Sequence, residues 1–144
     1  MCHGCGPVDV TTNTVARTVT LCETSRVADI AYAHGFFWGA RPDGSVVRIN
    51  SVTGAVQSFP GIVPNGGYGG VFLYGNGDLG FYDNAGYLRR VVVTDPGSGS
   101  PAFRLVSTQR GPSSGTNDAT SCIAPLTDLR IVKAGPAAIG AGGP

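Results

Sequence analysis

The chain repeats itself at a spacing of about 41 residues, and this repetition limits the folds open to it more than any other feature. Three pairs of segments share the spacing: 8–15 with 49–56 and 47–48 with 88–89, each 41 positions apart, and 35–39 with 77–81, which are 42 positions apart. A period of about 40–45 residues that carries four short strands is typical of a β-propeller blade. The repetition therefore predicts a series of blades.

Short apolar or alternating runs, divided by turn residues, fill each repeat. We expect strands at 29–32, 36–39, 45–49 and 55–59 in the first unit, and at 70–74, 79–82, 87–93 and 103–107 in the second. Residues 27–34 also have a spacing compatible with a helix, but their likeness to the later strand favours a strand. With a half blade at 8–21, the sequence predicts an all-β fold: a partial β-propeller of about two and a half four-stranded blades, followed by a C-terminal β-strand and tail.

A closed propeller contains about four to eight blades, so two and a half blades do not close a ring. We expect either a fragment of a longer protein or a homo-oligomer whose copies complete the ring together. The fragment is favoured because the chain begins in mid-blade. Residues 109–124 read as a polar loop, and the strand-like segment 129–133 then precedes a Gly-rich end, which places a domain boundary near Ala124.

Composition excludes several classes of protein. Ten basic and nine acidic residues give a net charge of +1, so the chain has no electrostatic footprint for nucleic acid or for a membrane surface. No apolar run approaches the roughly 18 residues that span a bilayer, so we expect no membrane insertion. Charged residues make up 13% of the chain, with one Lys and one Glu, which excludes a coiled coil and a charge-rich helical bundle.

Two motifs match enzyme patterns but lack the required context. Residues 75–80 read GNGDLG, as in a dinucleotide site, yet residues 81–86 do not form the helix that would hold a pyrophosphate. Residues 111–115 read GPSSG, as in a nucleophile elbow, yet no histidine follows Ser113. We interpret the first as an Asn-Gly hairpin turn and the second as a flexible loop.

Other candidate groups are also better explained by structural roles. Asn76, Asp78, Asp83 and Asn84 offer oxygen ligands for calcium, but they lack the regular spacing of a calcium loop and a bidentate Glu. We therefore interpret them as turn residues, and we expect no metal site. We expect His34 to lie in a turn, and Arg89 and Arg90 to point to opposite faces of one strand. We expect the following aromatic residues to belong to the core: Phe36, Phe37, Trp38, Tyr74, Phe81, Tyr82 and Tyr87.

The four cysteines do not form a recognisable site. Cys2 and Cys5 have the spacing of a zinc or redox pair, but the other cysteines and the two histidines, His3 and His34, supply no second close pair. No helix is expected after Cys5, as a redox motif of the thioredoxin type would require. We expect a mobile start without chemistry, with zinc binding or a disulfide as the alternatives.

The repeat units resemble an uncharacterised propeller-like domain of secreted surface proteins from actinobacteria and other bacteria. In that family a blade combines an aspartate-led strand, an aromatic strand and the pattern R-I-[ND]-x-x-T-G. The matching residues here are Asp29, Phe37, Trp38, Arg48, Ile49, Asn50, Thr53 and Gly54. A closing signature similar to N-D-G-A-x-C is matched by Asn117, Asp118, Ala119 and Cys122. Residues 128–136 then resemble the first strand of an Ig-like conserved repeat, so that the resemblance covers about residues 27–136.

The resemblance implies a location outside the cell or on its surface, where disulfides persist. It also implies that Cys122 pairs with a cysteine near the start of the propeller, a place that Cys22 takes here if the geometry allows it. We therefore expect the chain to have three parts: a mobile start and half blade at 1–21, two blades plus a closing loop at 22–124, and the start of an Ig-like repeat or a linker at 125–144. The family offers no catalytic residues to carry over.

The favoured function is a non-catalytic propeller-like module of a secreted or surface-anchored bacterial protein, with a structural, adhesive or ligand-contact role. We expect no enzyme activity, no catalytic or cofactor-binding residue and no cofactor, and the ligand or surface partner is left open. The alternative is a metal-dependent hydrolase or lactonase of the six-bladed type. That chemistry needs a convergent Glu/Asp/Asn cluster, and Glu23 is the single Glu. A non-functional truncated reading frame is the third interpretation.

Overall fold

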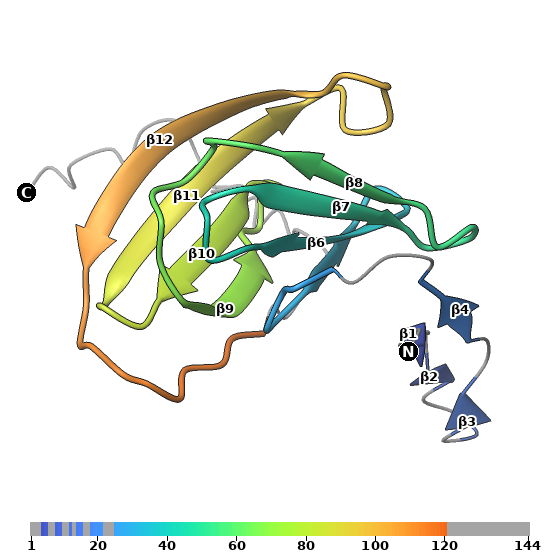
Figure 1. Ribbon diagram of the computed structural model, residues 1–144, viewed down its shortest axis with the longest axis horizontal. Coiled ribbons are helices and arrows are strands. Elements are labelled where there is room, and N and C mark those ends of the chain that lie inside the picture. Colours follow the sequence, from blue (N-terminus) through green and yellow to red (C-terminus); the bar gives the residue numbers. More distant parts are fainter. Residues whose placement is uncertain are drawn as a thin grey trace, which may run out of the picture.

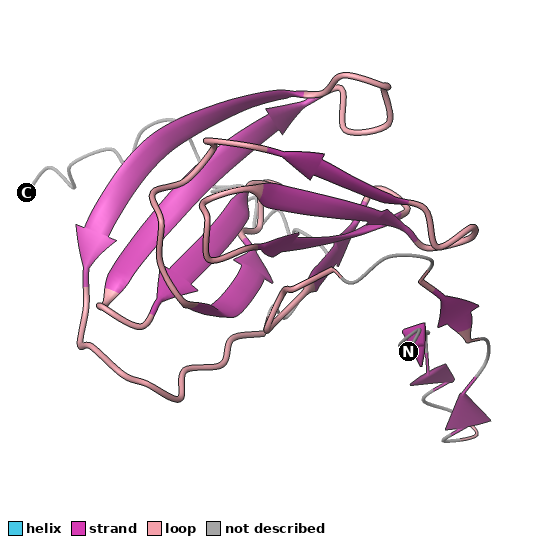
Figure 2. Ribbon diagram, in the orientation of Figure 1, coloured by secondary structure: helices cyan, strands magenta, loops and turns pink. Residues whose placement is uncertain are grey.

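The described part of the chain is built from β-strands. The computed structural model describes residues 4–5, 8–9, 12, 14–15, 18–21 and 25–120, and within these ranges it contains twelve strands. Two four-stranded antiparallel sheets follow one another along the chain (Figures 1 and 2). The expected all-β fold is confirmed, and the open arrangement of its sheets is compatible with a partial propeller. No helix of a length and hydropathy suited to crossing a membrane occurs in the described ranges.

Blade 1 is a meander in which each strand pairs with the next. Its strands are β5 (Ala31–Ala33), β6 (Phe36–Ala40), β7 (Val46–Asn50) and β8 (Val56–Phe59). The turns between them contain Gly35, Gly44 and Gly54, all with positive φ angles, which glycine adopts without steric cost. The segment 27–34 does contain a strand, as expected, but the strand is Ala31–Ala33 and not 29–32, and the Asp29 carboxylate before it accepts the N–H groups of Ile30 and Val71.

Blade 2 repeats this meander with longer outer strands. Its strands are β9 (Tyr68–Leu73), β10 (Leu79–Asp83), β11 (Tyr87–Thr94) and β12 (Ala102–Arg110). The prediction that the strand ends at Ser107 and a loop begins at Gln109 is wrong, since β12 continues to Arg110 opposite Tyr87. This end of β12 is polar and exposed at a sheet edge, so hydrogen bonds to β11 form it without any apolar pattern in the sequence.

The half blade predicted before blade 1 has the expected hairpin. β2 (Val8–Asp9) pairs with β3 (Thr14–Val15), and its pairing of Val8 with Val15 repeats the pairing of Ile49 with Val56 exactly 41 positions later. β1 (Gly4–Cys5) and β4 (Val19–Thr20) form a second short pair beside it. The repeat therefore extends to this N-terminal region.

The match of residues 47–48 with 88–89 is off by one position. The turn glycines Gly44 and Gly86 are 42 residues apart, and each donates its N–H to the carbonyl three residues earlier. Arg48 lies opposite Trp38, and Arg90 lies opposite Gly80, so the structural counterpart of Arg48 is Arg90. The correction matters because a shift of one residue moves a side chain to the other face of a strand.

The largest core lies between the two blades. Trp38 and Val46 of blade 1 are buried together with Leu79, Phe81 and Val91 of blade 2. The Trp38 indole is 1% exposed. Its Nε1–H donates to the Ala33 carbonyl at 3.1 Å, and its ring meets Phe103 edge-on at 6.2 Å between centroids. The expectation that the aromatic residues form the core is confirmed for Trp38 and Phe81.

The opposite face of blade 1 is covered as well. Val47 and Ile49 are buried with Leu21, which belongs to the segment before the blade, and Val27, Phe37 and Val56 pack around them. Adjacent positions on β7 thus point to different cores, and Val46 and Val47 are both fully buried. A sheet buried on both faces is what a blade between two neighbours requires.

Several predictions fall on residues outside the described ranges. These include the Cys22–Cys122 disulfide, the boundary near Ala124 and the Ig-like strand at 128–136. The expectations for Cys2 and Cys5 are untested too, because Cys2 lies outside the described ranges and only the backbone of Cys5 is described. They stay predictions.

Replacing Trp38 with alanine should remove much of the packing between the blades. We expect Trp38→Ala to lower the free energy of unfolding by about 3–5 kcal/mol, measured by urea denaturation. Tyr32→Ala is the control, since Tyr32 lies on a neighbouring strand but is 53% exposed, and its loss should cost about 1 kcal/mol. Equal losses for the two variants would contradict the assignment of Trp38 to the main core.

Candidate functional site

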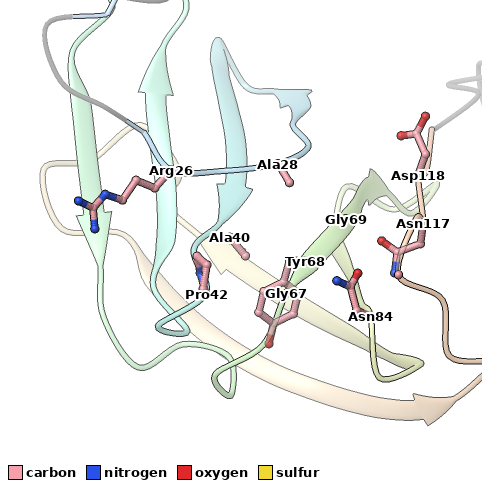
Figure 3. Close-up of a pocket in the computed structure, with 11 residues that line it drawn as sticks. Arg26, Ala28, Ala40, Pro42, Gly67, Tyr68, Gly69, Asn84, Asn117 and Asp118 are labelled. Carbon is pink, nitrogen blue, oxygen red and sulfur yellow. The ribbon is translucent and has the colours of Figure 1, made fainter. Parts of the chain in front are cut away.

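A cleft of about 420 Å³ opens at the end of the blades where the β6–β7 and β10–β11 hairpins turn (Figure 3). We call it the axial cleft. Three stretches of chain contribute to its walls: residues 26–28 before β5, residues 67–69 at the start of β9, and residues 115–118 after β12. Ala40, Pro42 and Asn84 of the two hairpins complete the lining.

Two of the three stretches lead to an aspartate with the same local hydrogen bond, and the third leads into β9, which is the first strand of its sheet as β5 is. The Asp29 carboxylate accepts the N–H of Ile30 at 2.8 Å, and the Asp118 carboxylate accepts the N–H of Ala119 at 2.9 Å. The second Asp29 oxygen accepts the N–H of Val71, and this hydrogen bond links the residues just before β5 to β9. Residues 117–119 in turn lie against β9.

Gly69 in β9 and Gly67 just before it leave room for neighbouring amide side chains. A Cβ added at Gly69 would lie 1.8 Å from the Asn117 Oδ1, and one added at Gly67 would lie 2.7 Å from the Asn84 Nδ2. One added at Gly70 would lie 3.0 Å from the Ala119 Cβ. The segment 117–119 therefore packs directly on β9.

The Asn117 carboxamide has no hydrogen-bond partner among the described residues, although its Nδ2 and Oδ1 are both buried. Leaving such a group unpaired costs about 1–3 kcal/mol. Figure 3 shows Asn84 and Asn117 on the blade 2 side of the cleft, with Ala28 and Ala40 across it and the Arg26 side chain extending away. The wall of the cleft thus contains an amide group whose donor and acceptor have no partner among the described residues.

Tyr68 forms part of the floor and is almost fully buried. Its hydroxyl donates to the Pro64 carbonyl. Burial raises the pKa of Tyr68 to about 12, because the phenolate loses its hydration; the positive charge of Arg89 opposes this change and the negative charge of Asp83 adds to it.

The four oxygen-bearing residues considered for calcium do not form one site. Asp78 and Asp83 lie just before and at the end of β10, respectively. Asp83 pairs with Arg89 at 2.5 Å and Asp78 pairs with Arg90 at 2.6 Å. No group of three or more His, Cys, Asp and Glu side chains suited to a metal occurs within the described ranges. Sequence reasoning missed both ion pairs, and the register of β10 with β11 was the signal needed to find them.

The first enzyme-like motif is the expected hairpin turn, and the second lacks regular secondary structure, as a loop does. Residues 75–80 are the β9–β10 turn and the start of β10, with Gly77 at a φ of +88°. Residues 111–115 are an irregular segment after β12, held by the Tyr82 hydroxyl, which donates to the Pro112 carbonyl. His34 lies in the β5–β6 turn with a φ of +53°, as expected.

Comparison with known protein families finds a match over residues 5–124 to a repeat of unknown function, DUF6923. The matched range contains the N-terminal hairpin, both blades and the segment 117–119. No curated protein matches the chain.

The two ion pairs of blade 2 should differ in their contribution to stability. Arg89→Met leaves the buried Asp83 carboxylate without its cation, and we expect a loss of about 3–5 kcal/mol in the free energy of unfolding. Arg90→Met breaks a pair whose arginine is 37% exposed, and it should cost about 1 kcal/mol or less. Urea denaturation compares the variants. Similar losses would show that burial does not distinguish the pairs.

The raised pKa of Tyr68 predicts a loss of stability at high pH. In the unfolded chain Tyr68 ionises near its ordinary pKa of 10.0, whereas in the folded chain it stays protonated up to about 12. The stabilisation is therefore fully present below pH 10 and is lost as the pH rises toward 12. Denaturation measured between these pH values should show a steeper fall for the natural chain than for Tyr68→Phe. Parallel profiles would contradict the prediction.

Proposed function

The chain belongs to the DUF6923 family of repeats, and we propose that it is a non-catalytic, propeller-like module that contacts a ligand in the axial cleft. The observation that supports this most strongly is the buried Asn117 carboxamide, which has no partner among the described residues, in a cleft where three stretches of the chain meet. A concave site with a few converging polar groups is the usual form of a ligand site.

The ligand we propose is polar and carries an amide or neighbouring hydroxyl groups. A carboxamide presents one acceptor and two donor hydrogens in one plane, which suits a partner of the same kind. Arg26, Asn84 and Asp118 also line the cleft, and much of the remaining lining is small or apolar, with Ala28, Ala40, Pro42 and the glycines 67 and 69. These small and apolar residues add contact area without charge.

The acidic residues near the cleft support binding rather than catalysis. The carboxylate of Asp118 accepts the N–H of Ala119, as the carboxylate of Asp29 accepts that of Ile30. Asp83, behind Tyr68, is neutralised by Arg89. These carboxylates thus have structural partners, so the proposal uses none of them as an acid, a base or a metal ligand.

The setting that we propose is a secreted or surface-anchored bacterial protein, in which the module serves adhesion or display. The support is the resemblance of its blade pattern, including Asp29, Trp38 and Arg48 to Asn50, to domains of such proteins. Within that setting, further blades, from the same protein or from other copies of the chain, would complete the ring.

The proposal is tested by titrating the isotope-labelled chain with N-acetylglucosamine and with N-acetylalanine methylamide, two amide-bearing probes. At least one probe should cause saturable changes in the NMR signals of the Asn117 side chain and of Gly69. Asn117→Ala should abolish them. Asn76→Ala is the control, because Asn76 is exposed in a turn at the other end of the blades. Absence of saturable changes with both probes at about 10 mM would contradict the proposal.

A further inference from the structure

A second cleft, of about 410 Å³, lies at the opposite end of the blades. It is formed between the β7–β8 end of blade 1 and the loop that joins β11 to β12 in blade 2. Its lining includes Phe36, Arg48, Asn50, Gln57 and the loop residues Gly97 to Gly99. We call it the Arg48 cleft. It shares no residue with the axial cleft.

Arg48 is a buried cation with neutral partners. Its residue is 6% exposed, and its guanidinium donates to the Pro96 carbonyl and to the Gln57 Oε1. The Phe36 ring centroid lies 4.5 Å from the guanidinium carbon. No carboxylate in the described ranges forms an ion pair with it. Burial lowers the pKa of Arg48, because the charged form loses hydration. A buried charge of this kind is normally paired.

Blade 2 shows what this position binds when a partner is present. Arg90, the counterpart of Arg48, donates to the Asp78 carboxylate at 2.6 Å. Asp78 is 42 positions after Phe36, the spacing that relates β6 to β10 through their preceding turn glycines, Gly35 and Gly77. The repeat therefore places a carboxylate beside one arginine and a phenyl ring beside the other.

We propose that the Arg48 cleft binds a small carboxylate ligand, whose carboxylate group takes the role at Arg48 that Asp78 has at Arg90. An arginine forms its strongest hydrogen bonds with carboxylates, and in this cleft the attraction is little screened by water. The cleft has the volume of a small-molecule site.

The surroundings of Arg48 suit such a ligand. The Gln57 Nε2 donates to the Gly99 carbonyl, so that Gln57 links Arg48 to the blade 2 loop across the cleft. Gly97 and Gly99 have open space where a Cβ would be, which leaves that side of the cleft unobstructed. The Phe36 ring offers an apolar face for the body of the ligand.

The test compares two carboxylates with a neutral analogue. Glucuronate and succinate are titrated into the chain at constant ionic strength, with glucose as the neutral probe, and binding is measured by calorimetry and by the change in melting temperature. We expect at least one carboxylate to bind at least tenfold more tightly than glucose. Preference for glucuronate would indicate a sugar acid as the natural ligand, and preference for succinate a simple organic acid.

Phe36→Asp is the decisive variant, because it reproduces the arrangement of blade 2 and supplies an internal carboxylate to Arg48. It should fold, and it should weaken carboxylate binding at least tenfold. Arg48→Gln should have the same effect on binding, whereas Arg90→Gln, at the equivalent place in blade 2, should leave it unchanged. The proposal fails if neither carboxylate binds more tightly than glucose, or if Phe36→Asp binds the carboxylate as the natural chain does. Failure here would leave the axial cleft unaffected, since Asn117 lies at the other end of the blades.

Discussion

The packing of blade 1 on blade 2 is the interaction on which the rest of this structure depends. A four-stranded sheet with two apolar faces is not stable in water by itself, and each blade here covers a face of the other. Trp38 lies at the centre of this contact, fully buried and hydrogen-bonded to the Ala33 carbonyl. The two clefts are consequences of the same contact. The axial cleft lies at one end of the blade pair and the Arg48 cleft at the other, where the twisted sheets leave space between their turns.

Three arginines of the blades illustrate how burial and partner decide the role of one residue type. Arg89 is buried against a buried carboxylate, so it serves stability. Arg90 is more exposed, so its pair with Asp78 is expected to contribute less. Arg48 is buried against carbonyl oxygens and an aromatic ring, and it therefore carries the proposal of an anionic ligand. Because Arg48 and Arg90 are related by the repeat, the difference between them depends on the partner supplied at positions 36 and 78.

Much of the fold could be predicted because turns and apolar alternation are local. The eight blade strands lie where the turn residues and the period placed them, and the pairing of Val8 with Val15 follows the 41-residue spacing. The errors have physical reasons. The polar end of β12 has no apolar pattern, and the match of Arg48 to Arg89 failed because one extra position is visible only in the register of the hairpins. Asn117 was recognised as part of a closing pattern, but its unpaired amide depends on Gly69, which is 48 positions away.

The sequence by itself determined that this protein is all-β, that it is built from repeats of about 41 residues, and that Trp38 and Phe81 belong to the core. These properties depend on local preferences and on a period, both of which are readable along one chain. Only the tertiary structure decided that Asp83 and Asp78 are neutralised by arginines. It also decided that, among the residues it describes, Asn117 is buried without a partner and Arg48 has no carboxylate beside it. Charge pairing and burial depend on which side chains meet across strands and blades, and a residue's own sequence neighbours do not specify those contacts.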